Sequence, residues 1–357
     1  MLLEKAKEYA QDCISGKEIT TFEVETQCKW FLEDLEKQNN DYYPYYFDTK
    51  KISIIEGILK LLNFATGLNV VGKSIYDGLE NFQAFFVANI FGWKHKSDSN
   101  KFRYREVDLF IPRKNAKTFL AALIFIILML TEDEYSEFYS ICLDRDLAGE
   151  VKKAISQILE MSPAVAEYFK IPKTLSGRLE CTITHSFYQP RTAEANRNNS
   201  IHPSAFIADE FGAMKDISNV GAMKTGQLSV RNPLMFRLTS AYAEDKSPML
   251  AELDYLKKIY KGLEENERLF ALVYYATEEH LWDDIGLQMA NPLRIEENYE
   301  EIRDNRKQAL AKPEERTEYL TKNMNYFVPS NSGEAFVFID KLRKCKNTRG
   351  IFDWNGR

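Results

Sequence analysis

The apolar segment from Phe119 to Leu130 constrains the fold more than any other part of the sequence. At about a dozen residues, it is well short of the ~20 residues that a membrane-spanning helix requires. It is therefore expected to form a helix that the rest of the protein covers on all sides. A chain of 357 residues can bury a core of that size, so a soluble globular protein with one large domain is expected.

The middle of the chain contains short apolar runs that are bounded by polar turns and separated by helical stretches. The runs are Val107–Ile111, Phe138–Cys142, Ala205–Ala208, Met235–Thr239 and Phe270–Tyr275. Such runs are typical of a parallel sheet that is buried on both faces. The sequence therefore predicts an α/β fold in which helices pack on both sides of a parallel sheet.

Segments with helical periodicity flank this middle part, amphipathic before it and highly charged after it. They are 2–37, 52–64, 296–310 and 313–324. We expect an N-terminal helical region over 1–75, a core over 76–280 and a helical lid or linker over 281–350.

The formal net charge of −6 argues against a protein that coats nucleic acid through bulk electrostatics, because counterion release requires clustered lysine and arginine. Basic clusters at Lys94–Lys96 and Lys341–Lys346, followed by Arg349, leave local DNA contact open, and a solvated surface is the alternative for each. No basic leader followed by an apolar segment opens the chain, so a cytoplasmic setting is expected.

The cysteines and histidines are scattered along the chain. No CxxC pair and no nearby histidine at metal-ligand spacing accompanies the cysteines, which are Cys13, Cys28, Cys142, Cys181 and Cys345. The four histidines are isolated, so neither a histidine metal site nor a Ser-His triad is visible. Reduced cysteines with a structural role are expected.

A Lys-Thr pair lies where a predicted strand meets the buried helix. The segment Ile111–Thr118 reads Ile-Pro-Arg-Lys-Asn-Ala-Lys-Thr and follows the strand directly. This order of strand, loop, Lys-Thr and helix is the context that a phosphate-binding loop requires. The loop amides would bind the phosphates, Lys117 would reach the β- and γ-phosphates, and the Thr118 hydroxyl would ligate Mg²⁺.

The glycines that usually accompany such a loop are missing. Ile111 and Ala116 occupy their positions, so a chance Lys-Thr pair at a helix start is an alternative while this segment is taken alone. If position 116 requires a positive φ, alanine there costs on the order of 1 kcal/mol. We hypothesise that Ala116 weakens nucleotide binding and slows hydrolysis.

Two adjacent carboxylates end a second predicted strand. Asp209 and Glu210 directly follow the run Ala205–Ala208. At the end of a parallel strand, Asp209 would lie beside the loop and hold the Mg²⁺ shell, while Glu210 would orient and deprotonate an attacking water. The adjacent glutamate indicates an ATPase of the ASCE type.

Hydroxyl side chains end a third predicted strand. Thr239 and Ser240, followed by Ala241, come after the apolar run that begins at Met235. Beside the loop, these hydroxyls could sense the γ-phosphate and relay its loss. Strand ends with Thr-Ser are frequent, so this segment alone does not distinguish an ATPase from another α/β protein.

Together these segments resemble the large terminase subunits of tailed bacteriophages, in the branch whose loop reads P-R-K-N-G-K-[ST]. Pro112–Thr118, Asp209–Glu210 and Thr239–Ala241 resemble that family's Walker A, Walker B and coupling motifs. Other segments resemble its adenine-recognition segment, the lead-in to its loop and two later motifs: Glu80–Gln83 with Phe91–Trp93, Phe102–Arg105, Ala290–Pro292 and Lys322–Asn325. The likeness spans nearly the whole chain.

The resemblance implies an ASCE P-loop ATPase with a RecA-like sheet, which binds ATP and Mg²⁺. The residues that it places around the nucleotide are Phe82, Gln83, Pro112, Arg113, Lys114, Asn115, Ala116, Lys117 and Thr118. It assigns Mg²⁺ binding to Thr118 and Asp209. It assigns coupling of phosphate loss to movement to the three residues Thr239, Ser240 and Ala241.

The catalytic residues that the resemblance implies come from the loop, the second strand and a neighbouring subunit. Glu210 would activate water, and Lys117 and Arg113 would bind the γ-phosphate. Arg197 is the candidate for an arginine finger that reaches the neighbouring subunit, with Arg191 and Arg145 as alternatives.

The resemblance further implies a motor that drives double-stranded viral DNA into a procapsid. The expected partners are DNA, the portal protein, a small terminase subunit and other copies of the chain, in a pentameric ring when assembled and open to being monomeric in isolation. The expected location is the host-cell cytoplasm at the procapsid portal, without a membrane. Family members continue into a C-terminal nuclease beyond a segment like Phe352–Trp354, so a chain that stops there is expected to lack that domain.

Two alternatives stay open. Another nucleic-acid-dependent ASCE ATPase, such as a helicase, would share the loop, the carboxylates and Gln83, but it would need a second RecA-like domain, for which too few residues follow Tyr275. A non-enzymatic scaffold would carry Lys117 and Glu210 by chance. Lys117→Ala should abolish nucleotide binding in an enzyme and change nothing in a scaffold.

Overall fold

The computed structural model describes residues 2–143, 145–174, 177–192, 201–243 and 246–328. Its centre is an eight-stranded sheet in the order β10-β3-β9-β8-β4-β7-β6-β5. These strands are β3 (Glu106–Phe110), β4 (Glu137–Cys142), β5 (Phe169–Lys170), β6 (Leu179–Cys181), β7 (Phe187–Thr192), β8 (Ala205–Asp209), β9 (Leu234–Thr239) and β10 (Leu269–Val273). The strands from β10 to β7 are parallel, and β6 and β5 are antiparallel at one edge. The predicted α/β fold with a mainly parallel sheet is confirmed.

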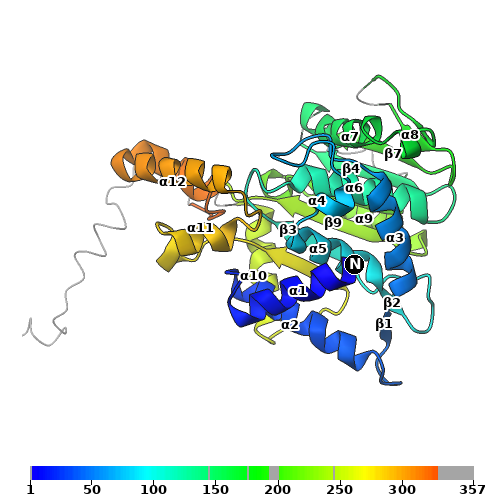
Figure 1. Cartoon of the computed structure of the whole chain (residues 1–357), viewed down its shortest axis with the longest axis horizontal. Helices are drawn as coiled ribbons and strands as arrows, with labels where there is room; N and C mark the ends of the chain where they lie inside the picture. The colour runs from blue at the N-terminus through cyan, green and yellow to red at the C-terminus, as the bar shows by residue number, and fades with distance from the viewer. Residues whose placement is uncertain (1, 144, 175–176, 193–200, 244–245, 329–357) are drawn as a thin grey trace, which may run out of the picture.

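Helices pack on both faces of the sheet (Figure 1). The larger hydrophobic core lies between one face and α1 (Leu2–Ser15), α2 (Phe22–Lys37), α3 (Thr49–Leu61), α5 (Asn81–Gly92), α6 (Lys117–Thr131) and α7 (Arg145–Glu160). The second core lies between the other face and α9 (Ser218–Gly226) and α10 (Pro248–Tyr260). The short helices α4 (Ile75–Gly78) and α8 (Pro163–Ala166) and the antiparallel pair of β1 (Tyr45–Phe47) with β2 (Trp93–His95) complete this part.

Helix α6 is the apolar segment of the sequence, and it is buried as expected. Its residues from Leu120 to Met129 are all buried. Among the described residues, no helix has the length and apolar character needed to cross a membrane. The four cysteines in this part of the chain are buried and free, and Cys345 lies outside it.

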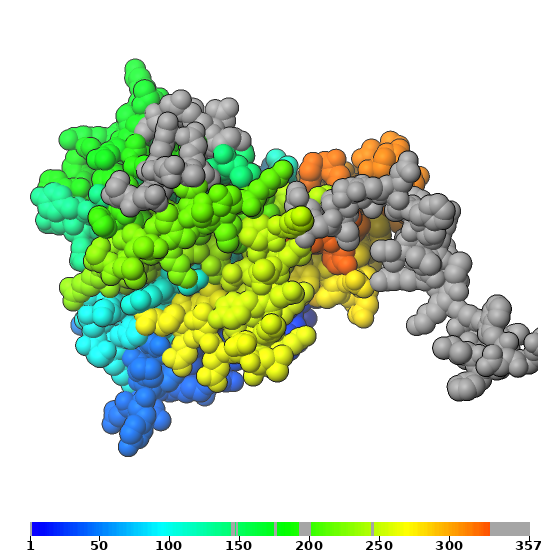
Figure 2. Space-filling view, turned by 180° about the vertical axis from the view of Figure 1, so that it is seen from behind, coloured from blue at the N-terminus to red at the C-terminus, as the bar shows by residue number. Residues whose placement is uncertain are grey.

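Helices after residue 280 form a separate layer beyond one end of the sheet, which Figures 1 and 2 show projecting from the body. They are α11 (Asp284–Ala290), α12 (Glu296–Ala311) and α13 (Arg316–Lys322). Their apolar side chains form a small core of their own, which includes Leu287, Tyr299 and Tyr319. We call this layer, residues 281–325, the lid, after the lid or linker predicted over 281–350, whose role remains a prediction.

Five predicted strands are present within a residue or two of their predicted positions, and others were missed. One strand was predicted between the loop and Asp209, whereas the structure has β4 and β7 there, with the short β5 and β6. Strand β7 contains Gln189, Pro190 and Arg191, which interrupt the apolar pattern. The domain boundaries remain a prediction; the larger core includes side chains from both sides of residue 75.

The proposed basic surface at Lys94–Lys96 is wrong for its first residue. Lys94 is 4% exposed, and its Nζ lies 3.4 Å from the centre of the Phe102 ring. Burial lowers the pKa of Lys94 to about 8. The second basic cluster, Lys341–Lys346, lies outside the described residues.

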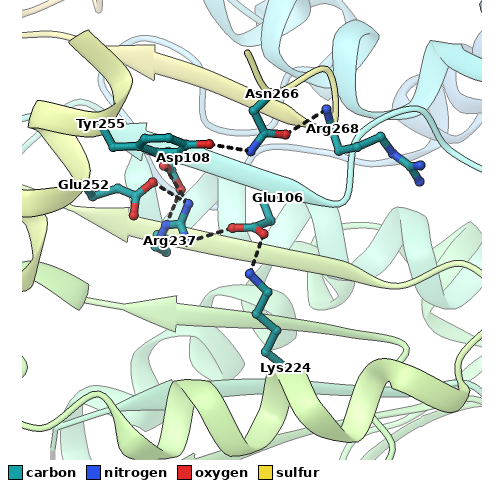
Figure 3. Close-up of polar contacts among 8 residues, drawn as sticks. All are labelled: Glu106, Asp108, Lys224, Arg237, Glu252, Tyr255, Asn266 and Arg268. Carbon is teal, nitrogen blue, oxygen red and sulfur yellow. Dashed lines mark hydrogen bonds and ion pairs between the residues drawn. The ribbon is translucent and has the colours of Figure 1, made fainter. Parts of the chain in front are cut away.

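A group of charged side chains lies between β3, β9 and α10, as Figure 3 shows. The guanidinium of Arg237 donates to both oxygens of Asp108, at 2.6 and 3.0 Å, to Glu106 at 3.0 Å and to Glu252 at 2.9 Å. Asp108 and Arg237 are direct neighbours in the register of β3 and β9. We call these four residues the Arg237 cluster. It links β3 and β9, two of the strands whose ends lie at the site described next.

Candidate active site

The predicted phosphate loop connects β3 to α6 through a turn with left-handed backbone. Ala116 caps the helix with φ 61° and ψ 26°, and Lys114 has φ 69°. Position 116 therefore has the positive φ on which the hypothesis of strain at Ala116 depends. Residues with a Cβ adopt this conformation at a cost of roughly 1 kcal/mol, which glycine avoids.

The loop lysine lies between the two carboxylates at the end of β8. Lys117 Nζ is 2.7 Å from Glu210 Oε1 and 3.4 Å from Asp209 Oδ1. Strand β9 separates β3 from β8 in the sheet, so the lysine reaches across the end of β9. The structure thus brings together Lys117, Asp209 and Glu210, which we call the Lys117 cluster, at the carboxyl ends of parallel strands, where open α/β sheets bind their ligands.

Burial and mutual charge set the protonation of this cluster. Burial lowers the pKa of Lys117, but the two carboxylates outweigh it, so that its pKa is raised. Burial raises the pKa of Glu210, but the charge of Lys117 outweighs it and holds that pKa below its usual value. For Asp209, burial prevails over Lys117, and the pKa is raised. Lys117 and Glu210 are therefore held as an ion pair.

The predicted coupling segment is packed against the turn that follows Glu210. Thr239 Oγ1 accepts a hydrogen bond from the backbone N–H of Gly212 at 2.8 Å. A Cβ on Gly212 would lie 2.8 Å from the same oxygen, so this approach requires glycine. Thr239 also accepts, through its backbone carbonyl, from the N–H of Ile111 at 3.0 Å. The coupling strand thus contacts both the loop and the end of β8.

One loop residue holds the lid. The Asn115 side chain donates to Asn291 Oδ1 at 2.8 Å and accepts from the backbone N–H of Leu293 at 3.2 Å. A cavity of about 340 Å³ opens beside this contact, between the loop residues Arg113–Asn115 and the helices α12 and α13. Asn291 belongs to the segment Ala290–Pro292, which the sequence analysis singled out without a role.

The other residues predicted around the nucleotide differ in how far they are exposed to solvent. Pro112 is buried, Arg113 and Lys114 are exposed, and Thr118 is half-buried at the start of α6. Phe82 is 2% exposed and packs against the ring of Tyr274 at 6.0 Å between ring centres. Gln83 is also buried, and its side-chain oxygen accepts from the backbone N–H of Glu80 at 3.1 Å. In this structure Phe82 and Gln83 serve the packing and capping of α5.

The three candidate arginine fingers lie in different segments of the chain. Arg197 lies outside the described residues, and for Arg145 only its place at the start of α7 is described. Arg191 lies on β7, with its guanidinium carbon 5.0 Å from the centre of the Tyr139 ring.

Two residues at the site had no role in the sequence analysis. The hydroxyl of Tyr242 donates to Glu210 Oε2. Asn325 accepts from the backbone N–H of Ala241 at 2.7 Å and donates to the carbonyl of Tyr274 at 2.6 Å. Asn325 closes the segment Lys322–Asn325 that resembles a family motif, whereas Tyr242 lies in a polar loop without any sequence signal.

The fold and these strand-end residues define a P-loop NTPase domain with a RecA-like sheet. Residues 81–258 match the family model described as the terminase large subunit, ATPase domain. This segment of the chain is therefore a terminase large subunit ATPase domain, as the resemblance implied. A comparison with curated proteins gives no match.

Solved structures of phage packaging proteins are similar to this chain to different degrees, and the first of them shares its fold. The large terminase of bacteriophage HK97 matches with a TM-score of 0.64 and 20% identity, over 79% of this chain and 56% of that chain. The large terminase ATPase domain of Thermus phage P74-26 matches at 12% identity and a TM-score of 0.45, over 62% of this chain and 88% of that one. The gp11 DNA packaging motor of Phi-28 matches at 13% identity and 0.35, over 63% and 66%. The chain thus spans little more than half the length of the HK97 protein.

Proposed function

We propose that this chain binds Mg²⁺-ATP at the loop between β3 and α6 and hydrolyses it, as the motor part of a large terminase that packages DNA. The observation that carries the proposal is the position of Lys117, whose Nζ lies within 3.4 Å of both Asp209 and Glu210. A phosphate-binding lysine, a metal-binding carboxylate and a water-activating carboxylate are the side chains that hydrolysis of a nucleoside triphosphate requires. The family assignment of residues 81–258 supports the same conclusion.

The loop and helix α6 would bind the phosphates. Helix α6 is fifteen residues long, and its first-turn N–H groups and dipole favour an anion at its N-terminus. Lys117 would exchange its contact with Glu210 for the phosphate oxygens. Arg113, which is exposed on the same loop, would neutralise charge on the γ-phosphate.

Thr118 and Asp209 would hold Mg²⁺. The hydroxyl and the carboxylate lie at the start of α6 and the end of β8, and they are the hard oxygen donors that Mg²⁺ prefers. Within the described residues, no group of three or more His, Cys, Asp or Glu side chains could hold a metal by itself. The two protein ligands therefore fit a metal that completes its shell with phosphate and water oxygens. When bound, Mg²⁺ neutralises charge on the phosphates.

Glu210 would orient the attacking water and accept its proton. The ion pair with Lys117 keeps this carboxylate ionised, which a general base requires. Arg197 remains the proposed finger from a neighbouring subunit. Loss of the γ-phosphate would be sensed at Thr239 and Ser240, of which Thr239 contacts the loop and the turn after Glu210.

The proposed substrate of the motor is double-stranded viral DNA, which would be driven into a procapsid in the host cytoplasm. The proposed partners are the portal protein, a small terminase subunit and further copies of this chain in a pentameric ring. Asn115 and Asn325 tie the lid to the loop and to the coupling segment, which gives a route from the nucleotide to the lid.

The test compares Mg²⁺-dependent ATP binding and hydrolysis for the wild-type chain, Lys117→Ala and Glu210→Gln. Lys117→Ala should lose binding, and Glu210→Gln should bind ATP with little turnover. Lys224→Ala is the matched control, because Lys224 also pairs with a glutamate, Glu106 at 2.5 Å, away from the site. The proposal is contradicted if Lys117→Ala binds ATP with the wild-type affinity. It is also contradicted if neither the wild-type chain nor any variant binds ATP. Stimulation of turnover by double-stranded DNA separates the packaging motor from an ATPase that acts alone.

A further inference from the structure

Both carboxylate oxygens of Glu210 have a partner in the structure. Lys117 approaches Oε1 at 2.7 Å, and the hydroxyl of Tyr242 donates to Oε2. The two partners come from different elements, the start of α6 and the segment that follows β9. The proposed function uses Lys117 and leaves Tyr242 without a role.

The main chain next to Tyr242 is anchored through Asn325. The N–H of Ala241 donates to Asn325 Oδ1 at 2.7 Å, and Asn325 in turn donates to the carbonyl of Tyr274 at the end of β10. Asn325 is 1% exposed, so these hydrogen bonds are made away from solvent. The phenol of Tyr242 therefore projects from a backbone that both the sheet and the end of the lid hold in place.

Glu210 itself has an unusual backbone. Its φ of 52° and ψ of 39° are left-handed, and its N–H donates to Asp209 Oδ1 at 3.0 Å. This conformation fixes where the side chain leaves the chain but not where its carboxylate points. The carboxylate direction is set by its two partners.

Binding of ATP, as proposed above, removes one of these partners. When the phosphates take Lys117, Oε1 of Glu210 becomes free to accept a proton from water, and Oε2 keeps its hydrogen bond from the phenol. We infer that Tyr242 is a positioning residue, which holds the Glu210 carboxylate toward the attacking water and connects its orientation to the coupling segment and Asn325. The inference rests on the proposed function.

The first arm of the test measures Glu210 directly and does not depend on turnover. The full chain is labelled with ¹³C at the glutamate carboxyl carbons, and the Glu210 signal is assigned by its loss in Glu210→Gln. Because the phenol stabilises the ionised carboxylate, the pKa of Glu210 should be higher in Tyr242→Phe than in the wild-type chain. Tyr45→Phe is the matched control, since Tyr45 donates to Glu267 at 3.0 Å, far along the chain from the site. An unchanged titration of Glu210 in Tyr242→Phe contradicts the inference.

The second arm measures hydrolysis. Hydrogen bonds to charged groups are among the strong ones, so Tyr242→Phe should lower kcat by about 10- to 100-fold while the affinity for a fluorescent ATP analogue stays unchanged. The acidic limb of its profile of kcat/KM against pH, which reports the free enzyme, should move to higher pH by the shift seen in the first arm. If the wild-type chain hydrolyses ATP and Tyr242→Phe has the same kcat, the inference about Tyr242 is wrong, while the proposed function still holds. A wild-type chain that binds no ATP overturns the proposed function instead.

Discussion

Two clusters of charged side chains occupy neighbouring strands, and they differ in how their cation is held. In the Arg237 cluster, a guanidinium in mid-strand grips both oxygens of Asp108, and the two side chains are 7% and 0% exposed. In the Lys117 cluster, an ammonium at the end of the sheet lies near two carboxylates, and the side chain of Glu210 is 24% exposed. A guanidinium fixes its partners through its planar geometry, whereas an ammonium is a point charge with interchangeable partners. One cluster is suited to holding strands together, and the other is suited to exchanging a carboxylate for a phosphate.

The largest expected effect is on folding stability and comes from removing the buried guanidinium. Arg237→Met leaves Asp108 as a buried carboxylate without its cation, so the free energy of unfolding in urea should fall by about 3–5 kcal/mol. Lys117→Met should cost less than half of that, because Glu210 is partly exposed and keeps Tyr242. The double variant Asp108→Leu/Arg237→Met is the control and should recover most of the loss. Equal destabilisation by Arg237→Met and Lys117→Met would remove the distinction between the clusters.

A smaller effect should depend on pH. Burial, with Asp108 beside it, raises the pKa of Glu252 from an ordinary 4.5 to about 7. Because the folded pKa lies above the unfolded one, the stabilising contribution of Glu252 is complete below pH 4.5 and is lost as the pH rises through 7. Glu252→Gln should therefore match the wild-type stability near pH 4 and exceed it by about 3 kcal/mol at pH 8.

The pH series has a control of opposite sign in the same cluster. Burial raises the pKa of Glu106, but Arg237 and Lys224 outweigh it and hold that pKa below its usual value. The contribution of Glu106 is therefore present above its unfolded pKa and lost as the pH falls. Glu106→Gln should lower the stability measured at pH 8, and the loss should shrink toward pH 3. If both variants shift stability in the same direction at pH 8, the charge balance assigned to the cluster is wrong.

A third effect concerns the loop of the Lys117 cluster. Ala116→Gly should relieve up to about 1 kcal/mol of backbone strain, because φ is 61° there. Thermal unfolding without nucleotide measures this gain, and ATP affinity should rise by up to about fivefold if the strain opposes binding. Ala121→Gly, within the buried helix α6, is the control and should destabilise. An unchanged affinity and turnover in Ala116→Gly would contradict the hypothesis that alanine weakens the site.

The smallest effect is expected at the rim of the Arg237 cluster. Lys224 pairs with Glu106 at 2.5 Å, but the side chain of Lys224 is 55% exposed. Exposed ion pairs contribute little and are screened by salt, so Lys224→Ala should change the free energy of unfolding by less than about 0.5 kcal/mol. A loss of stability comparable to that in Arg237→Met would show that the exposed Lys224–Glu106 pair stabilises the fold as much as the buried Arg237–Asp108 pair.

The sequence predicted the strands that are mostly apolar and the residues at their ends. Strands β3, β8 and β9 read as apolar runs because both of their faces are covered, although β3 carries the buried Asp108 and β9 the buried Arg237. Strand β7 was missed because Gln189, Pro190 and Arg191 lie within it. Strand β7 pairs with the short antiparallel strand β6, near the edge of the sheet, where polar residues can occur within a strand. The spacing of apolar residues along one segment does not show which strand will lie beside it.

Only those site residues that belong to a recognisable sequence motif could be predicted from the sequence. Lys117, Asp209 and Glu210 were found together because strand ends of a parallel sheet meet at one edge. Tyr242 and Asn325 contribute through contacts between segments distant in sequence, such as the pair Asn325 and Ala241. Long-range hydrogen bonds of this kind leave no local pattern, so the sequence showed at most that Asn325 lies in a motif.

The left-handed alanine of the loop has a consequence at the level of the genetic code. Every alanine codon becomes a glycine codon through a single base change, so the residue that removes the strain at Ala116 is always one mutation away. Lys114, with its φ of 69°, has no such neighbour, because lysine and glycine codons differ at two bases or more. Under selection for a less strained loop, we therefore expect relief to arise first at position 116.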